Sequence, residues 1–86
     1  MKTNKIYFFT APWCSACKAL KPNFIKWAED NNVSYELIDV ESDSSIELVE
    51  KNKIRNLPTL VFVDAEDNVI GRETGNVQVN ILEKYL

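Results

Sequence analysis

Two cysteines, Cys14 and Cys17, are the residues of this chain whose type and spacing most directly suggest chemistry. They lie three positions apart in the segment Cys14-Ser15-Ala16-Cys17, and the 86 residues contain no other cysteine and no histidine. A disulfide between them would close a very small ring and would stabilise the fold little. A structural zinc site would need two further ligands of good type, so we expect no metal. Without histidine, neither Ser-His-Asp nor Cys-His catalysis is available.

The pair stands where a strand is expected to give way to a helix, and this position favours a reactive thiol. If the helix begins near Ser15, Cys14 lies at its N-cap and Cys17 one turn further on. Unpaired N–H groups and the helix dipole then lower the pKa of the Cys14 thiol. We therefore predict an exposed nucleophile, Cys14, which attacks a substrate disulfide, and a buried resolving thiol, Cys17. Alone, the Cys-x-x-Cys motif also fits a chance occurrence or half of a metal site; its strand–helix context favours redox chemistry.

Apolar patterning predicts the elements that position the pair. Short apolar runs predict strands over residues 6–10, 33–40, 60–63 and 68–73, with a bulge at Gly71. Helical periodicity predicts a helix over residues 15–31, kinked at Pro22. The apolar residues expected on its buried side are Cys17, Leu20, Phe24, Trp27 and Ala28.

Two shorter helices are predicted from capping signals. Ser44-Ser45-Ile46-Glu47 fits a capping box that opens a helix ending near residue 52. Asn76 is expected to cap a last helix. The inward residues of these helices are expected to be Ile46, Leu48 and Val49 in the first, and Val77, Ile81, Leu82 and Tyr85 in the second.

The order of these elements, β-α-β-α-β-β-α, predicts an α/β fold with a four-stranded mixed sheet sandwiched between helices. The two strand–helix–strand steps predict right-handed crossovers in a parallel portion of the sheet, and the last two strands predict a hairpin.

Composition narrows the class of protein. The chain is 45% hydrophobic, which is typical of a globular domain rather than a disordered chain, and its length suits a single domain over residues 1–86. Its 10 Lys+Arg against 13 Asp+Glu argue against non-specific nucleic-acid binding. No apolar run suits a signal peptide or a membrane span, so we expect a cytoplasmic monomer that binds no membrane.

Four motifs, in order along essentially the whole chain, resemble the thioredoxin family. Residues 11–18 resemble its Trp-Cys-x-x-Cys-Lys active site, and Pro22 matches its kinking proline. Residues 54–60 resemble the segment that carries its cis-proline, and Gly75 matches the glycine beside its substrate groove. The resemblance implies a minimal thioredoxin fold and a thiol–disulfide oxidoreductase that acts on disulfides of protein substrates.

The resemblance also implies roles for residues around the pair. Trp13 is expected as a surface contact, and a cis bond at Leu57-Pro58 would expose the Leu57 backbone to an extended substrate peptide. In the family this proline also keeps metals away from the cysteines. Gly75 would let a substrate approach the backbone. The resemblance implies no bound cofactor: electrons reach the Cys14–Cys17 disulfide from a thioredoxin-reductase-like partner or from glutathione, in electron transport and cell redox homeostasis.

Two departures from the family concern the chemistry of the pair. Phe8 stands where the family has a buried acidic residue, which leaves Glu36, Asp39 or water to accept the proton of the resolving thiol. Ser15-Ala16 replace the usual Gly-Pro, so a backbone N–H and a hydroxyl can stabilise the thiolate. We therefore predict a pair more oxidising than that of an ordinary thioredoxin.

A third departure is the start of the chain, which lacks the family's usual first strand and helix, as in glutaredoxins. Three alternatives remain open beside the thioredoxin-like enzyme: a glutathione-dependent, glutaredoxin-like enzyme, a non-redox binding module on the same fold, and a metal or cluster carrier. Trp13, the Ser-Ala pair and the Leu57-Pro58-Thr59 segment favour the thioredoxin-like enzyme over the glutaredoxin-like one.

Overall fold

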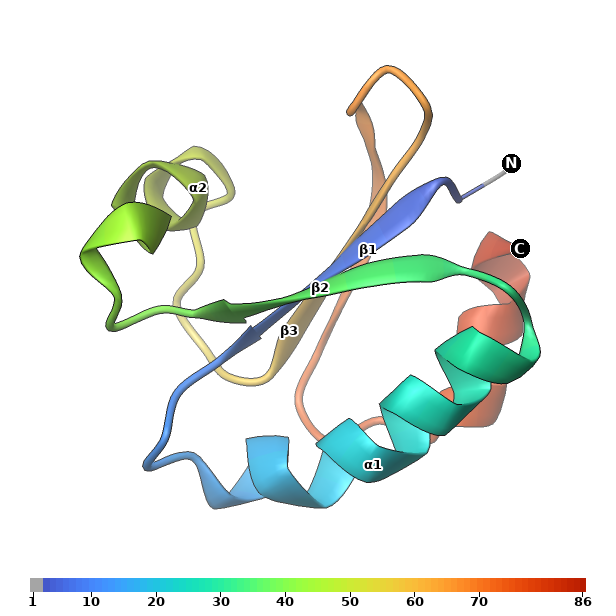
Figure 1. Cartoon of the computed structure of the whole chain (residues 1–86), viewed down its shortest axis with the longest axis horizontal. Helices are drawn as coiled ribbons and strands as arrows, with labels where there is room; N and C mark the ends of the chain where they lie inside the picture. The colour runs from blue at the N-terminus through green and yellow to red at the C-terminus, as the bar shows by residue number, and fades with distance from the viewer. Residues whose placement is uncertain (1–2) are drawn as a thin grey trace.

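A computed structural model describes residues 3–86 as a four-stranded sheet with helices on both faces (Figure 1). The strands are β1 (Lys5–Thr10), β2 (Ser34–Asp39), β3 (Thr59–Val63) and β4 (Val69–Thr74), in the spatial order β2-β1-β3-β4. β1 pairs parallel with β2 and antiparallel with β3, and β3 pairs antiparallel with β4. The predicted mixed sheet and its final hairpin are therefore confirmed.

The expectation of two parallel crossovers is wrong for the second step. The helix that follows β2, α2 (Ile46–Lys51), has six residues and a length of about 9 Å, too short to carry the chain back along the sheet. β3 therefore starts at the edge where β2 stops, as the pairs Thr10–Asp39 and Phe9–Thr59 show. From that edge β3 can only run antiparallel to β1.

The helix after β1, α1 (Ser15–Asp30), has the predicted bounds to within one residue. Pro22 lies inside it, and because proline has no N–H, the carbonyl of Lys18 loses its helical partner. The kink itself stays a prediction. The buried residues of α1 are the five predicted ones: Cys17, Leu20, Phe24, Trp27 and Ala28.

The apolar core lies on both faces of the two central strands. Ile6 and Phe8 of β1 point to the face covered by α1 and the C-terminal helix η2 (Val79–Tyr85), where the larger cluster forms. Phe9 of β1 and Val61 of β3 point to the other face, toward α2. This explains why β1 and β3 are nearly continuous apolar runs.

The capping box predicted at Ser44 is wrong. The chain first forms a short 3-10 turn, η1 (Asp43–Ser45), and the Ser44 hydroxyl lies 2.9 Å from the hydroxyl of Ser42 instead of capping a helix. Ile46 is 50% exposed, against expectation. Leu48 and Val49 pack against the smaller cluster, as predicted.

The last helix also differs from prediction. η2 is a 3-10 helix that begins after Gln78, so Asn76 does not cap it. With three residues per turn, the inward positions recur every third residue. Leu82 is accordingly buried, with Val77, Val79 and Tyr85 packed on the core, while Ile81 is exposed.

The bulge predicted in β4 is present but is displaced by one residue. Phe62 pairs with Gly71 and Val63 with Val69, so the extra residue is Ile70. The glycine has a different role. A Cβ atom at Gly71 would lie 2.2 Å from Cε1 of Tyr85, whose ring stacks on Phe62 with the ring centroids 3.9 Å apart.

Candidate active site

The two cysteines lie at the first turn of α1 and are joined by a disulfide. Cys14 is the N-cap, with extended backbone, and its Sγ accepts a hydrogen bond from the Cys17 N–H at 3.1 Å. Their Cα atoms are 5.3 Å apart. The predicted N-cap position is confirmed, and it places the sulfur of Cys14 against the unpaired donors of a helix N-terminus.

The two sulfurs differ in access, although less than predicted. Cys17 is fully buried, and Cys14 is 7% exposed. The description of Cys14 as an exposed nucleophile is therefore wrong for this disulfide form, because the residue packs into the larger core cluster together with Cys17. Cys14 is still the more accessible of the two.

Trp13 is the most exposed large apolar residue of the described chain, at 65%. Its indole Nε1 donates a hydrogen bond to the carboxylate of Glu41, just beyond β2. Beside it lies a groove of about 450 Å³, whose other lining residues are Val40, Val49, Ile54, Arg55, Asn56 and Leu57. Nothing in the sequence pattern pointed to Glu41, since its partner comes from a loop 28 positions away.

The segment Leu57-Pro58 and Gly75 come together at the start of β3. The Leu57-Pro58 peptide bond is cis, and Pro58 is buried. Its carbonyl accepts a hydrogen bond from the Gly75 N–H at 2.9 Å. Gly75 has φ of +91°, and a Cβ atom there would meet nothing within 4 Å, so this backbone faces open space. Leu57 packs against the cluster that contains both cysteines.

Ser15 and Ala16 occupy the turn between the cysteines. Ser15 is exposed, and Ala16 is half-buried against the larger cluster. Among residues 3–86 the only hydrogen bond to the Cys14 sulfur comes from Cys17, so neither Ser15 nor Ala16 donates to it in the disulfide form. Their effect on the thiolate stays a prediction.

Within residues 3–86 no buried carboxylate takes the place of the acid expected from the family resemblance. Phe8 is fully buried, with its ring centroid 5.0 Å from that of Phe24. Glu36 forms an ion pair with Lys5, with 2.9 Å between its carboxylate oxygen and the Lys5 Nζ. The carboxylate of Asp39 accepts the N–H of Glu41 at the exposed end of β2. The buried residues of the described chain include no Asp or Glu.

Across residues 3–86, no three His, Cys, Asp or Glu side chains gather where they could hold a metal ion. Within the same range, none of the helices combines the length and the apolar character that crossing a membrane requires.

Comparison with known proteins assigns the chain to a family. The family model described as Thioredoxin matches residues 2–86. Thioredoxin of Pyropia yezoensis is 30% identical over 81 residues, which cover 91% of this chain and 76% of the relative. Thioredoxin 1 of Thermosipho africanus has a similar structure, with a TM-score of 0.79 at 28% identity, covering 94% of this chain and 92% of that one. Thioredoxin F from spinach chloroplast, long form, gives a TM-score of 0.83 at 27% identity, over 98% of this chain and 69% of that one.

The chain belongs to the thioredoxin family. Its fold is the thioredoxin fold, and its cysteine pair stands at the strand–helix junction as a Trp-Cys-x-x-Cys motif. It is a thiol–disulfide oxidoreductase, and this identification is favoured over a binding module or a glutathione-dependent enzyme.

Proposed function

We propose that the protein reduces disulfides of protein substrates by a dithiol mechanism, with Cys14 as the nucleophile and Cys17 as the resolving thiol. The observation that carries this assignment is the N-cap position of Cys14, whose sulfur accepts the Cys17 N–H. That donor, together with the helix dipole, favours a thiolate at Cys14. The complete burial of Cys17 favours its neutral thiol and a role after the first step.

The reaction proceeds in two exchanges. The Cys14 thiolate attacks one sulfur of the substrate disulfide, forming a mixed disulfide and releasing the other sulfur as a thiolate. Cys17, on losing its proton, attacks the Cys14 sulfur, closes the Cys14–Cys17 bond and releases the second substrate thiolate. Two electrons pass to the substrate. With no buried carboxylate in the described chain, water is the proton acceptor we propose for Cys17.

We place the substrate peptide between Trp13 and the Leu57-Pro58 segment. Neither the N–H nor the carbonyl of Leu57 has a hydrogen-bond partner within residues 3–86, so both can pair with an extended peptide. The open backbone of Gly75 adjoins Pro58. Trp13 and the apolar groove beside it would bury a side chain that flanks the substrate cysteine.

The Cys14–Cys17 disulfide is the redox group of this proposal, and no bound cofactor is part of it. We propose a thioredoxin-reductase-like protein as the electron donor, because the Trp13-containing motif is that of the thioredoxin family. A cytoplasmic monomer engaged in cell redox homeostasis is the setting we propose for this electron transport.

Substitution of each cysteine tests the two roles. With insulin as the disulfide substrate, Cys14→Ser should abolish turnover and trap nothing. Cys17→Ser should also abolish turnover, but should accumulate a mixed disulfide through Cys14, seen by mass spectrometry and released by dithiothreitol. Trapping through Cys17 in the Cys14→Ser protein would reverse the assignment. Full activity of Cys14→Ser would contradict dithiol chemistry.

A comparison of reductants tests the electron donor. The oxidised protein should be reduced by NADPH with a thioredoxin reductase faster than by glutathione with glutathione reductase, each at physiological concentration. Faster reduction by glutathione would favour a glutaredoxin-like cycle and would leave the cysteine roles intact.

A further inference from the structure

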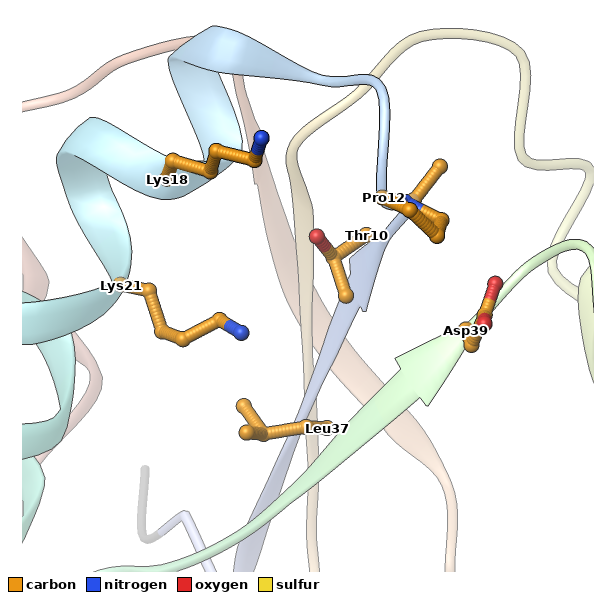
Figure 2. A pocket seen from close by; sticks show the side chains of 7 residues that line it. Thr10, Pro12, Lys18, Lys21, Leu37 and Asp39 are labelled. Atoms are coloured by element: carbon orange, nitrogen blue, oxygen red, sulfur yellow. The ribbon is translucent and has the colours of Figure 1, made fainter.

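A second hollow shares no lining residue with the Trp13 groove. It has a volume of about 360 Å³ and opens between the first turns of α1, the end of β1 and the end of β2. Figure 2 shows Lys18 and Lys21 reaching into it from α1, with the hydroxyl of Thr10 and the side chain of Leu37 facing them from the strands. The reaction proposed above for the cysteines gives no role to the side chains that line this hollow.

The hollow has two positively charged side chains, whereas the chain as a whole has a net negative charge. The protein carries a net charge of −3, yet Lys18 and Lys21 place two ammonium groups on one concave surface. Within the described residues neither lysine forms an ion pair, whereas Lys5, Lys26, Lys51 and Lys84 each do. Two unpaired cations that share a hollow repel each other, and a bound anion would relieve that repulsion.

The one acidic residue that lines this hollow, Asp39, forms no ion pair with the lysines among the described residues. The Asp39 carboxylate lies at the far edge of the hollow from the lysines in Figure 2. One of its oxygens accepts the N–H of Glu41 at 2.9 Å, and no ion pair joins it to Lys18 or Lys21 among residues 3–86. The lysine side of the hollow is thus left with donors and no acceptor charge.

We propose that this hollow is a binding site for a small oxyanion, a phosphate or a carboxylate group. Lys18 and Lys21 supply two charged donors from successive turns of α1, and Thr10 supplies a hydroxyl donor from β1. Leu37 and Ala11 form an apolar wall that suits the carbon skeleton of a small organic anion. A volume of about 360 Å³ exceeds that of an inorganic oxyanion alone, so the hollow has room for such a skeleton.

An NMR titration of the oxidised 86-residue protein tests the site. Backbone amide shifts are followed while sodium phosphate, and in a second arm disodium succinate, replaces sodium chloride at constant ionic strength. We expect saturable shifts at Thr10, Lys18, Lys21 and Leu37 with at least one probe. The arm that saturates at lower concentration identifies the headgroup as phosphate or carboxylate.

Matched lysine variants make the test specific. Lys21→Met should raise the apparent Kd of that probe about tenfold, since a charge-assisted hydrogen bond is lost. Lys18→Met removes the other ammonium group, and the same rise in the apparent Kd is expected. Lys26→Met is the control, because Lys26 lies on the same helix but pairs with Asp30 at 3.0 Å, outside the hollow; its Kd should match that of the wild type.

Three outcomes would overturn the proposal. Shifts that grow linearly with both probes would show general ionic effects only. Equal losses in the Lys21→Met and Lys26→Met proteins would place the binding elsewhere. Shifts at the hollow that appear only with an acidic peptide would make it a docking point for a protein side chain rather than a small-anion site.

Discussion

In the disulfide form, the sulfur of Cys14 accepts a hydrogen bond from one N–H of the first turn of α1, that of Cys17. The turn between the cysteines contains another N–H, that of Ala16, which a proline in this position would lack. When the disulfide opens, the Cys14 thiolate gains charge at the N-terminus of the helix. Every N–H of that turn then stabilises the reduced form and raises the reduction potential.

Replacement of Ala16 by proline removes this N–H and so tests its contribution to the reduction potential. Ala16→Pro should lower the reduction potential by about 30 mV, which corresponds to about 1.4 kcal/mol of lost thiolate stabilisation. The measurement is equilibration with glutathione buffers, read by thiol alkylation. Ala16→Gly keeps the N–H and should stay close to the wild-type potential. A wild-type potential as low as that of an ordinary thioredoxin would contradict the predicted oxidising character, whatever the variant does.

Residue types predicted part of the site and left part of it unseen. The Cys14–Cys17 pair followed from spacing, and the N-cap position from the break between strand and helix. The contact between Trp13 and Glu41 did not, because it joins two loops whose separation depends on the whole sheet. The burial of Cys14 was also missed, since capping chemistry describes the donors around a sulfur but not the core packed behind it.

Helices long enough to show a clear periodicity of apolar residues were predicted well, and short helices were not. α1 has sixteen residues, and its five apolar positions on one stripe fix both its bounds and its buried side. α2 has six residues and η2 winds as a 3-10 helix, so neither offers enough turns for a 3.6-residue period to decide. The direction of β3 was missed although a short helix was predicted before it, because the rule for parallel crossovers was applied to a helix too short to span the sheet.

One aromatic residue of the C-terminal element η2 packs directly on the sheet, beside the buried Leu82. Tyr85 stacks on Phe62, and its hydroxyl donates to the carboxylate of Glu73 at 2.6 Å. Burial first, and then this hydrogen bond, raise the pKa of Tyr85 to about 12, so the hydroxyl stays protonated. The ring lies where a Cβ atom of Gly71 would stand.

Gly71→Ala should therefore destabilise the fold. Its new methyl group would overlap the Tyr85 ring, and overpacking of this kind costs about 1–3 kcal/mol in the free energy of unfolding. Urea denaturation measures it. In a double-mutant cycle with Tyr85→Ala the cost of Gly71→Ala should largely disappear, because the obstructing ring is gone. A cost that is unchanged without the ring would point to the backbone of β4 instead.

The carboxylate of Glu73 gives this contact a pH dependence. The hydrogen bond from Tyr85 first, and then Lys84 at 3.0 Å, lower the pKa of Glu73 below its usual 4.5. A depressed carboxyl pKa contributes stability above the unfolded pKa, and this stability is lost as the pH falls through the folded value. Wild type should thus be more stable than Glu73→Gln, by about 1 kcal/mol at neutral pH.

That difference should shrink below about pH 4.5, the range in which the carboxylate becomes protonated. Urea denaturation at a series of pH values from neutral to acid measures it. Glu83→Gln is the matched control, because Glu83 is an exposed residue of η2 without an ion pair in the described chain. A Glu73→Gln deficit that stays constant with pH would show lost packing rather than lost charge.

Across the whole molecule the core is divided unequally by the sheet. The larger cluster gathers α1, η2 and one side of β1 and β3, and it contains both cysteines. The smaller cluster has four buried residues, and α2 adds only the half-buried Leu48 and Val49. α2 buries no residue fully, and its N-cap Ser45 makes no capping hydrogen bond with its side chain. The elements on the two faces therefore differ in local stability.

Native-state hydrogen exchange should resolve that difference. Amides of α2 should exchange through a local opening whose free energy lies about 2 kcal/mol or more below that of the β1 and β3 amides, which open only with global unfolding. Val49→Ala sharpens the test, because Val49 both anchors α2 and lines the Trp13 groove. It should lower the opening free energy of α2 more than that of β1. An equal drop in both elements would mean that α2 unfolds only with the whole molecule, and that the wall of the groove is as rigid as the sheet.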